Sequence, residues 1–270
     1  MTPPKDLGRF VYVQSGSYRT SKSIDAPEAL ETPLSSGTAE AAAPPRTEAP
    51  RDVSVPEPFA GEHPSTVATS DREIAVLMSL RRPRLVLFGG LLSDAECDEL
   101  IQLSAHKVER SRTVNRDTGF MDIHVDRVSE GTFFHVNENP LVGRIDRRIA
   151  ELLDWPMENG EGLQIIHYGP GGEYKPHFDY FDTADPGSAV HIQQGGNRVA
   201  TLIMYLATPQ SGGTTIFPDA GLEVASVKGN AVFFSYGSPT PASLTLHGGA
   251  PVTAGEKWIA TKWLRTSAYK

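Results

Sequence analysis

From residue 163 onward, hydrophobic and polar positions alternate in short runs that are rich in β-branched and aromatic residues. Glycine-rich turns separate these runs. Such a pattern predicts β-strands. The strands are expected at 163–168, 174–179, 199–206, 214–217, 222–225, 231–234, 243–247 and 257–265. A series of short strands with glycine-rich turns predicts an antiparallel sandwich or barrel.

Before residue 163, the apolar positions have helical spacing instead. Ser93 and Glu96 are spaced as in a capping box, and the apolar residues behind them predict a helix over about 94–107. Asn139 resembles an N-cap followed by proline, which predicts a second helix over 140–153. We expect both helices to pack outside the β-structure. Shorter elements are expected at 74–80 (helix), 84–88 (strand) and 132–136 (extended).

The first part of the chain has a different composition. Residues 1–70 contain ten of the 21 prolines, and Ser, Thr, Ala and Glu fill most of the space between them. Such a segment buries too little apolar surface to offset its ordering entropy. We therefore expect a disordered arm over 1–70, with a short docking motif over 10–18 as an alternative, and one folded domain over 71–270.

Charge and cysteine content narrow the function classes. The formal net charge of −8 gives no general attraction for nucleic acid or anionic membranes, so we expect neither as a partner. Cys97 is the single cysteine and occupies an apolar position of an expected helix, which predicts a buried, unreactive thiol. Residues 1–18 contain no apolar run of signal-peptide length, so we expect a soluble, cytoplasmic protein.

Candidate metal ligands come from the expected strands. His177 and Asp179 are two residues apart, so in a strand they point to the same side. With His247 they would form two imidazoles and one carboxylate, the facial triad of non-haem Fe(II), which leaves coordination positions open. The alternative is that His177 makes only hydrogen bonds within the protein and binds no metal. A second triplet, His124 and Asp126, lies in a polar loop, and we expect a solvated histidine there.

A candidate cation lies ten residues after His247. Lys257 shares one strand face with Ile259, Thr261 and Trp263. If His247 points inward, Lys257 reaches the same cavity, where a lone lysine is costly unless it meets an anion. The alternative is an exposed lysine.

The polar stretch 111–131 is either a plain surface loop or a mobile cover over this site.

Four sequence blocks together carry a family resemblance. They read YGPGGEYKPHFDYF (168–181), RVATLIMYL (198–206), GGTTIFP (212–218) and LHGGAPV followed by GEKWIATKW (246–263). In this order they resemble the prolyl 4-hydroxylase family of 2-oxoglutarate- and Fe(II)-dependent dioxygenases, over about residues 83–267. The resemblance implies a mainly β, α+β fold: a double-stranded β-helix (jelly-roll) core with supporting N-terminal helices.

The resemblance also implies roles for individual residues. The residues that match the iron ligands are His177, Asp179 and His247. Those that match the positions binding the far carboxylate of 2-oxoglutarate are Lys257, Tyr168 and Thr215. Those that match the peptide-substrate side are Tyr174, Arg198 and Trp263. Arg127 resembles the start of the strand after the family's mobile lid, which favours the cover interpretation of 111–131.

The implied reaction consumes 2-oxoglutarate and O2, releases succinate and CO2, and hydroxylates a prolyl residue at its 4-position in a protein or peptide. Ascorbate is implied as the reductant. A carboxylate at Asp179 favours hydroxylation, because the related halogenases leave that site free for halide. Two alternatives remain: hydroxylation of another side chain or a small molecule, and a non-catalytic β-barrel binding module. The single cysteine departs from the disulfide-bonded secretory relatives, and the oligomeric state stays open.

Overall fold

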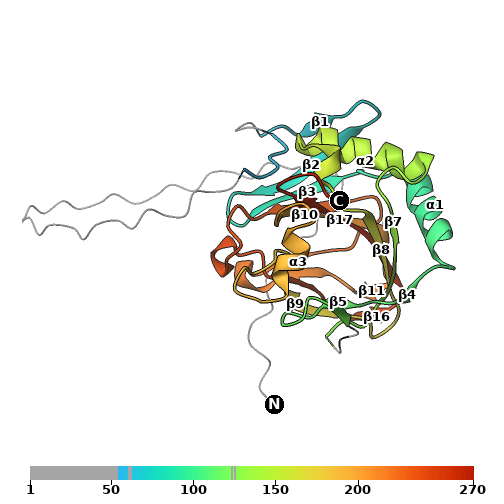
Figure 1. Ribbon diagram of the computed structural model, residues 1–270. Helices are drawn as coiled ribbons and strands as arrows, with labels where there is room; N and C mark the ends of the chain where they lie inside the picture. The colour runs from blue at the N-terminus through green and yellow to red at the C-terminus, as the bar shows by residue number, and fades with distance from the viewer. Residues whose placement is uncertain (1–53, 60–62, 123, 125) are drawn as a thin grey trace, which may run out of the picture. The chain divides into compact units, whose positions relative to one another are not determined.

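A nine-stranded antiparallel sheet is the frame of the protein (Figure 1). The computed structural model describes residues 54–59, 63–122, 124 and 126–270. In spatial order the strands of this large sheet are β1 (Thr66–Ala68), β2 (Glu73–Leu80), β3 (Arg84–Gly89), β14 (Ala231–Ser235), β10 (Arg198–Ala207), β17 (Lys257–Arg265), β8 (Leu163–Tyr168), β7 (Glu130–Phe134) and β4 (Glu109–Arg110).

A smaller sheet packs against the inner face of the large one. Its strands are, in spatial order, β13 (Leu222–Val224), β12 (Thr215–Phe217), β15 (His247–Gly249) and β9 (Tyr174–His177). Side chains of both sheets share one hydrophobic cluster, in which Tyr205, Phe217 and Phe234 are fully buried. Two face-to-face antiparallel sheets confirm the expected double-stranded β-helix. Two strand pairs stand apart: β11 (Ser211–Gly212) with β16 (Val252–Ala254), and β5 (Thr113–Val114) with β6 (Met121–Asp122).

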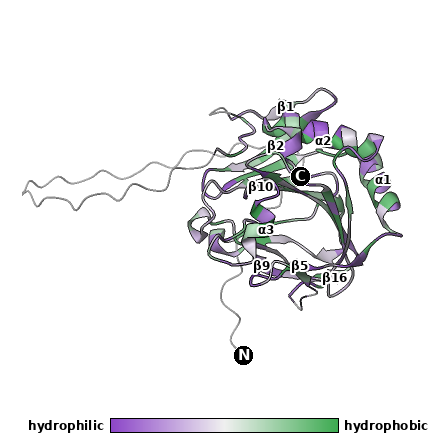
Figure 2. Cartoon of the chain, in the orientation of Figure 1, coloured by the Kyte–Doolittle hydropathy of each residue, from purple (hydrophilic) through white to green (hydrophobic). Residues whose placement is uncertain are grey.

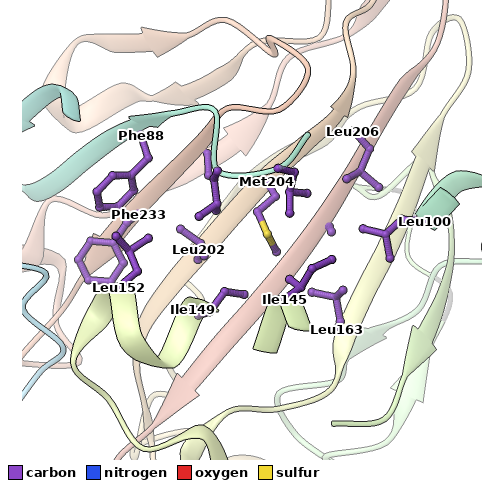
Figure 3. Close-up of a cluster of buried hydrophobic side chains, with 14 of the residues drawn as sticks. Phe88, Leu100, Ile145, Ile149, Leu152, Leu163, Leu202, Met204, Leu206 and Phe233 are labelled. Atoms are coloured by element: carbon purple, nitrogen blue, oxygen red, sulfur yellow. The ribbon is translucent and has the colours of Figure 1, made fainter. Parts of the chain in front are cut away.

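Two helices cover the outer face of the large sheet, as expected (Figure 1). The helix α1 (Asp94–Ser104) begins with the predicted capping box, and α2 (Pro140–Leu153) begins after Asn139, whose side chain accepts a hydrogen bond from the Val142 amide. Hydrophilic and hydrophobic residues alternate along α2 (Figure 2). Its apolar stripe lies against Leu202 and Met204 of β10 (Figure 3). The short helices are α3 (Ser188–Ile192), η1 (Met157–Asn159), η2 (Pro218–Ala220) and η3 (Pro241–Ser243).

Several predictions of secondary structure are wrong. Residues 74–80 form strand β2 rather than a helix, because pairing with β1 and β3 fixes an extended backbone there. Residues 243–246 are not a strand: η3 ends at Ser243, and β15 begins only at His247. The strand β1 lies inside the stretch expected to be disordered, so ordered structure begins before residue 71. The rest of that prediction, over 1–53, lies outside the described residues, as does the candidate docking motif.

Cys97 is buried in the core beneath the helices, as predicted. Burial raises the pKa of its thiol to about 11, so the unreactive thiol form prevails at neutral pH. Within the described residues, the structure contains no helix of sufficient length and hydrophobicity to traverse a lipid bilayer.

Candidate functional site

Two strands of the smaller sheet bring the predicted metal ligands together. His177 ends β9 and His247 begins β15, and these two residues lie opposite each other in the strand pairing. Asp179 lies just beyond β9, in a bend rather than in the strand that the sequence predicted. One ligand atom from each residue lies within 4.8 Å of the others. The Nε2 atoms of His177 and His247 lie 3.6 and 3.4 Å from the two carboxylate oxygens of Asp179.

Hydrogen bonds orient both imidazoles. The Nδ1 atom of His177 lies 2.9 Å from the carbonyl oxygen of Lys175, and that of His247 lies 3.0 Å from the carbonyl oxygen of Thr245. A carbonyl only accepts, so each Nδ1 carries the proton. The Nε2 lone pairs are then free and face the carboxylate, which is the arrangement that metal-binding histidines adopt.

The carboxylate of Asp179 is held in its ionised form. Burial alone would raise its pKa, but the positive charge that His247 and His177 carry when protonated, together with the guanidinium of Arg198, holds the pKa well below its usual range. One carboxylate oxygen also accepts a hydrogen bond of 2.7 Å from the hydroxyl of Thr201, which lies 2.9 Å from the Tyr236 hydroxyl. Thr201 and Tyr236 were not predicted from the sequence. Thr201 alternates with buried apolar residues on β10, and that inward polar position was the available signal.

The donor set fits a divalent metal ion. Burial lowers the pKa of His247 to about 4, so its imidazole is neutral at physiological pH, as a ligand has to be. Two imidazole nitrogens and one carboxylate on one side suit non-haem Fe(II). Among the described residues, this is the one group of three or more potential metal ligands whose ligand atoms lie this close together. His124 instead pairs with Asp126 at 3.2 Å, and both side chains are more than half exposed, as expected.

One cavity of about 1210 Å³ contains the three ligands and every other site residue predicted from the sequence. Lys257 lies in it, directly opposite Tyr168 in the pairing of β17 with β8. The lysine is 2% exposed, and within the described part of the chain no carboxylate lies within ion-pair distance of its ammonium. Burial therefore lowers its pKa to about 7. The lysine thus points inward, and the exposed alternative is wrong.

The hydroxyl of Thr215 provides a second hydrogen-bond donor on the Lys257 side of the cavity. The buried hydroxyl of Tyr205 donates a hydrogen bond of 2.9 Å to the hydroxyl oxygen of Thr215. Thr215 therefore keeps its own proton for another acceptor. Together with the Lys257 ammonium, this end of the cavity offers donors and positive charge to an anion.

Aromatic and cationic side chains border the ligands. The ring of Tyr174 stacks on the imidazole of His177 at 3.7 Å between centroids. The guanidinium of Arg198 lies 3.9 Å from the ring centroid of Trp263 and donates to the backbone oxygen of Asp179. Glu161 accepts two hydrogen bonds of 2.6 and 2.9 Å from the Arg198 guanidinium. Glu161 was not predicted from the sequence, because a single glutamate before a strand carries no pattern.

The polar segment 111–131 lies beside the cavity and is not a surface loop remote from the site. All residues from Arg112 to Asp117 line it, as do Met121 and Asp122. Near its end this segment contacts β9 through a bridge between Arg127 and Tyr174, and the Val128 amide donates to the carbonyl of Glu173, which directly precedes β9. The position agrees with a cover over the site. Its mobility stays a prediction.

A family model, related sequences and a solved structure all match this chain and agree with one another. Residues 163–265 match the family model of the 2OG-Fe(II) oxygenase superfamily. Prolyl 4-hydroxylase 2 of Arabidopsis thaliana is 36% identical over 211 residues, which is 70% of this chain and 69% of that protein. Prolyl 4-hydroxylase 5 of the same plant is 36% identical over 210 residues, 70% of each. A 2OG complex of the viral collagen prolyl hydroxylase from Paramecium Bursaria Chlorella virus-1 has a TM-score of 0.52 and 32% identity, and it covers 67% of this chain and 95% of its own.

Proposed function

Because the chain belongs to the prolyl 4-hydroxylase family of 2OG-Fe(II) oxygenases, we propose that it hydroxylates a prolyl residue, at the 4-position, in a protein or peptide. One observation carries the proposal: a His-Asp-His group shares its cavity with a buried lysine that has no carboxylate partner among the described residues. The ligand group suits Fe(II). The lysine needs an anion, and the far carboxylate of 2-oxoglutarate supplies one.

His177, Asp179 and His247 would hold the metal. Their own hydrogen bonds fix both imidazoles and the carboxylate before any metal binds, which reduces the cost of ordering them. When bound, Fe(II) with 2-oxoglutarate supplies the oxidising chemistry that transfers one atom of O2 to a C–H bond, while 2-oxoglutarate becomes succinate and CO2. The protein contributes ligands on one side only, so the other side stays open for the reactants.

Lys257, Tyr168 and Thr215 would bind the far carboxylate of 2-oxoglutarate. The ammonium provides a charge-assisted contact, and the free hydroxyl proton of Thr215 provides a donor. These residues lie on β17, β8 and β12, so both sheets hold the cosubstrate. Burial of this end excludes water, which strengthens each polar contact.

Tyr174, Arg198 and Trp263 would form the peptide side. Arg198 connects this side to the metal site, because it contacts the Trp263 ring and also donates to the backbone of Asp179. Its position is fixed by Glu161. Such fixed surfaces place a C–H bond accurately against the reacting centre. We also propose ascorbate as the reductant that keeps the iron as Fe(II), on the family resemblance alone, and a cytoplasmic location, on the sequence alone.

The proposal is tested by adding Fe(II) and 2-oxoglutarate to the full chain without oxygen, and then measuring succinate after O2 is admitted. Wild type is compared with His177→Ala, and His124→Ala serves as the matched control, since that histidine lies outside the metal group. We expect succinate from wild type and His124→Ala only. Addition of a proline-rich peptide should increase the yield of succinate, and the peptide itself should gain one oxygen atom.

Other outcomes would favour the alternatives. Succinate without stimulation by the peptide would keep the enzyme class and point to another side chain or a small molecule. Metal binding without succinate under any condition would support the non-catalytic binding module.

A further inference from the structure

Two lysines are buried in the part of the chain that the structure describes, and they differ in their partners. Lys257 and Lys262 are each 2% exposed. The ammonium of Lys262 lies 2.7 Å from the carboxylate of Asp146, which compensates its charge. For Lys257, the described residues provide no carboxylate within ion-pair distance. Before a cosubstrate binds, Lys257 is therefore the buried lysine that gains most from losing its charge.

The groups that the neighbouring strands pack beside the Lys257 amine are uncharged. Its Nζ atom lies 5.4 Å from the ring centroid of Tyr168, and burial raises the pKa of that phenol and of Tyr205, so both stay neutral. Thr215 pairs with Gly249 across β12 and β15, and a Cβ atom on Gly249 would lie 3.7 Å from Nζ. The glycine therefore leaves space beside the amine, and the Thr215 hydroxyl offers its proton on that side.

This environment makes the Lys257 amine a nucleophile. Burial lowers the pKa of Lys257 to about 7, so about half of the amine is unprotonated at pH 7. An ordinary lysine, with a pKa of about 10.4, has only about 0.04% of its amine unprotonated at that pH. An unprotonated lysine amine attacks electrophilic carbon atoms. The proposed reaction releases one such electrophile, CO2, in the same cavity.

We propose that the Lys257 amine combines reversibly with CO2 to form a carbamate when 2-oxoglutarate is not bound. The assignment of the lysine to 2-oxoglutarate and the source of the CO2 rest on the proposed function. The Nζ lone pair forms a bond to the carbon of CO2, one C=O π pair moves onto oxygen, and the nitrogen releases one proton to water. One amine and one CO2 give one carbamate anion and one proton, and nothing is oxidised or reduced.

The carbamate takes the place of the far carboxylate of 2-oxoglutarate. Its own carboxylate group is attached to Nζ, so it lies where an anion bound to the Lys257 ammonium would lie, and the Thr215 hydroxyl donates to it. The lysine also loses the positive charge that attracts the cosubstrate. CO2 and 2-oxoglutarate therefore exclude each other, and CO2 raises the KM for 2-oxoglutarate without lowering kcat.

Chemical trapping tests the proposal in the full chain without Fe(II), where no turnover takes place. The protein is equilibrated with isotopically labelled CO2 and bicarbonate, and a trialkyloxonium salt converts carbamates to stable esters that mass spectrometry locates. We expect the labelled ester on Lys257 and not on the paired Lys262, and saturating 2-oxoglutarate should prevent it. At a constant, low CO2 concentration, the ester should increase at least tenfold from pH 6 to pH 8, because the neutral fraction of the amine alone rises about tenfold.

Lys257→Arg is the variant that keeps a cation, and its guanidinium stays protonated and forms no carbamate. The CO2 concentration is set so that half of the ligand-free wild-type chains carry the ester. Under that condition CO2 should raise the apparent dissociation constant of 2-oxoglutarate about twofold in wild type, and leave it unchanged in Lys257→Arg. Lys175→Met is the matched control, since that lysine is exposed and paired with Glu173, and it should respond to CO2 like wild type.

Three results would overturn the carbamate: no ester on Lys257 at any of these pH values, equal amounts of ester with and without saturating 2-oxoglutarate, or weaker 2-oxoglutarate binding under CO2 in Lys257→Arg as well. The last result means that bicarbonate competes as a simple anion. If wild type with Fe(II), 2-oxoglutarate and O2 modifies no peptide, the prolyl hydroxylase function fails, and the ester on Lys257 still decides the carbamate separately.

Discussion

Replacing Lys257 by methionine should make the protein without ligand more stable and at the same time impair its binding of 2-oxoglutarate. Lys257 is 2% exposed, and in the described structure no carboxylate compensates the charge of its ammonium. Methionine is unbranched and fills a similar space without a charge. The substitution therefore removes the cost of burying the cation, and it also removes the group that would attract the cosubstrate.

The size of the effect follows from the pKa of Lys257, which burial lowers from 10.5 to about 7. This difference corresponds to about 5 kcal/mol of lost stability below pH 7, and the loss disappears as the pH rises from about 7 to 10.5, because only the unfolded state then keeps the proton. Relaxation and water entry reduce such costs. We expect Lys257→Met to be about 1 to 4 kcal/mol more stable at pH 7.

Binding should change in the opposite direction. Loss of a charge-assisted contact should weaken 2-oxoglutarate binding about 10- to 100-fold. In wild type, the dissociation constant should rise about fivefold from pH 7 to pH 8, since a neutral amine has to take up a proton first. That pH dependence should be absent in Lys257→Met.

Urea unfolding of the ligand-free protein and calorimetric titration with 2-oxoglutarate measure the two effects. Lys175→Met is the matched control: this lysine also lines the cavity, but it is exposed and paired with Glu173 at 2.8 Å. Lys175→Met should leave both the stability to urea and the affinity for 2-oxoglutarate nearly unchanged. Equal stability of wild type and Lys257→Met, together with the same pH dependence of binding, would refute the placement of an uncompensated cation at this position.

Other predictions concern the metal site and the core. His177→Ala and His247→Ala should each abolish Fe(II) binding and leave the circular dichroism spectrum unchanged, whereas His124→Ala should bind Fe(II) like wild type; retained binding in either of the first two would contradict the ligand assignment. Thr201→Val should weaken Fe(II) binding about 10- to 100-fold in a titration, because the Asp179 carboxylate loses the donor that orients it, and an unchanged affinity would make that hydrogen bond irrelevant. Cys97 should react with a thiol reagent only after unfolding, since it is fully buried and its pKa is raised to about 11; rapid reaction in the native protein would show that the core opens locally.

Local patterns in the sequence were sufficient for the helices and for most strands. The capping box at Ser93 and the N-cap at Asn139 formed where they were expected, because a cap depends on residues three positions apart. The alternation along β17 placed Lys257 and Trp263 together on the cavity side, as predicted, and the structure shows Trp258 among the core residues on the other side. A strand's two faces follow from its period of two residues, which the sequence contains directly.

Only the tertiary structure decided the remaining features. Residues 74–80 have an apolar pattern that suits a helix as well as a strand, and pairing with β3 selected the strand. The partners Thr201, Tyr236 and Glu161 are joined to the site by contacts between strands and loops that are separated along the chain. The sequence contains the ligand types and their spacing. The orientation of those ligands and the burial that shifts their pKa values arise only when the sheets and loops pack, because both depend on which distant residues become neighbours.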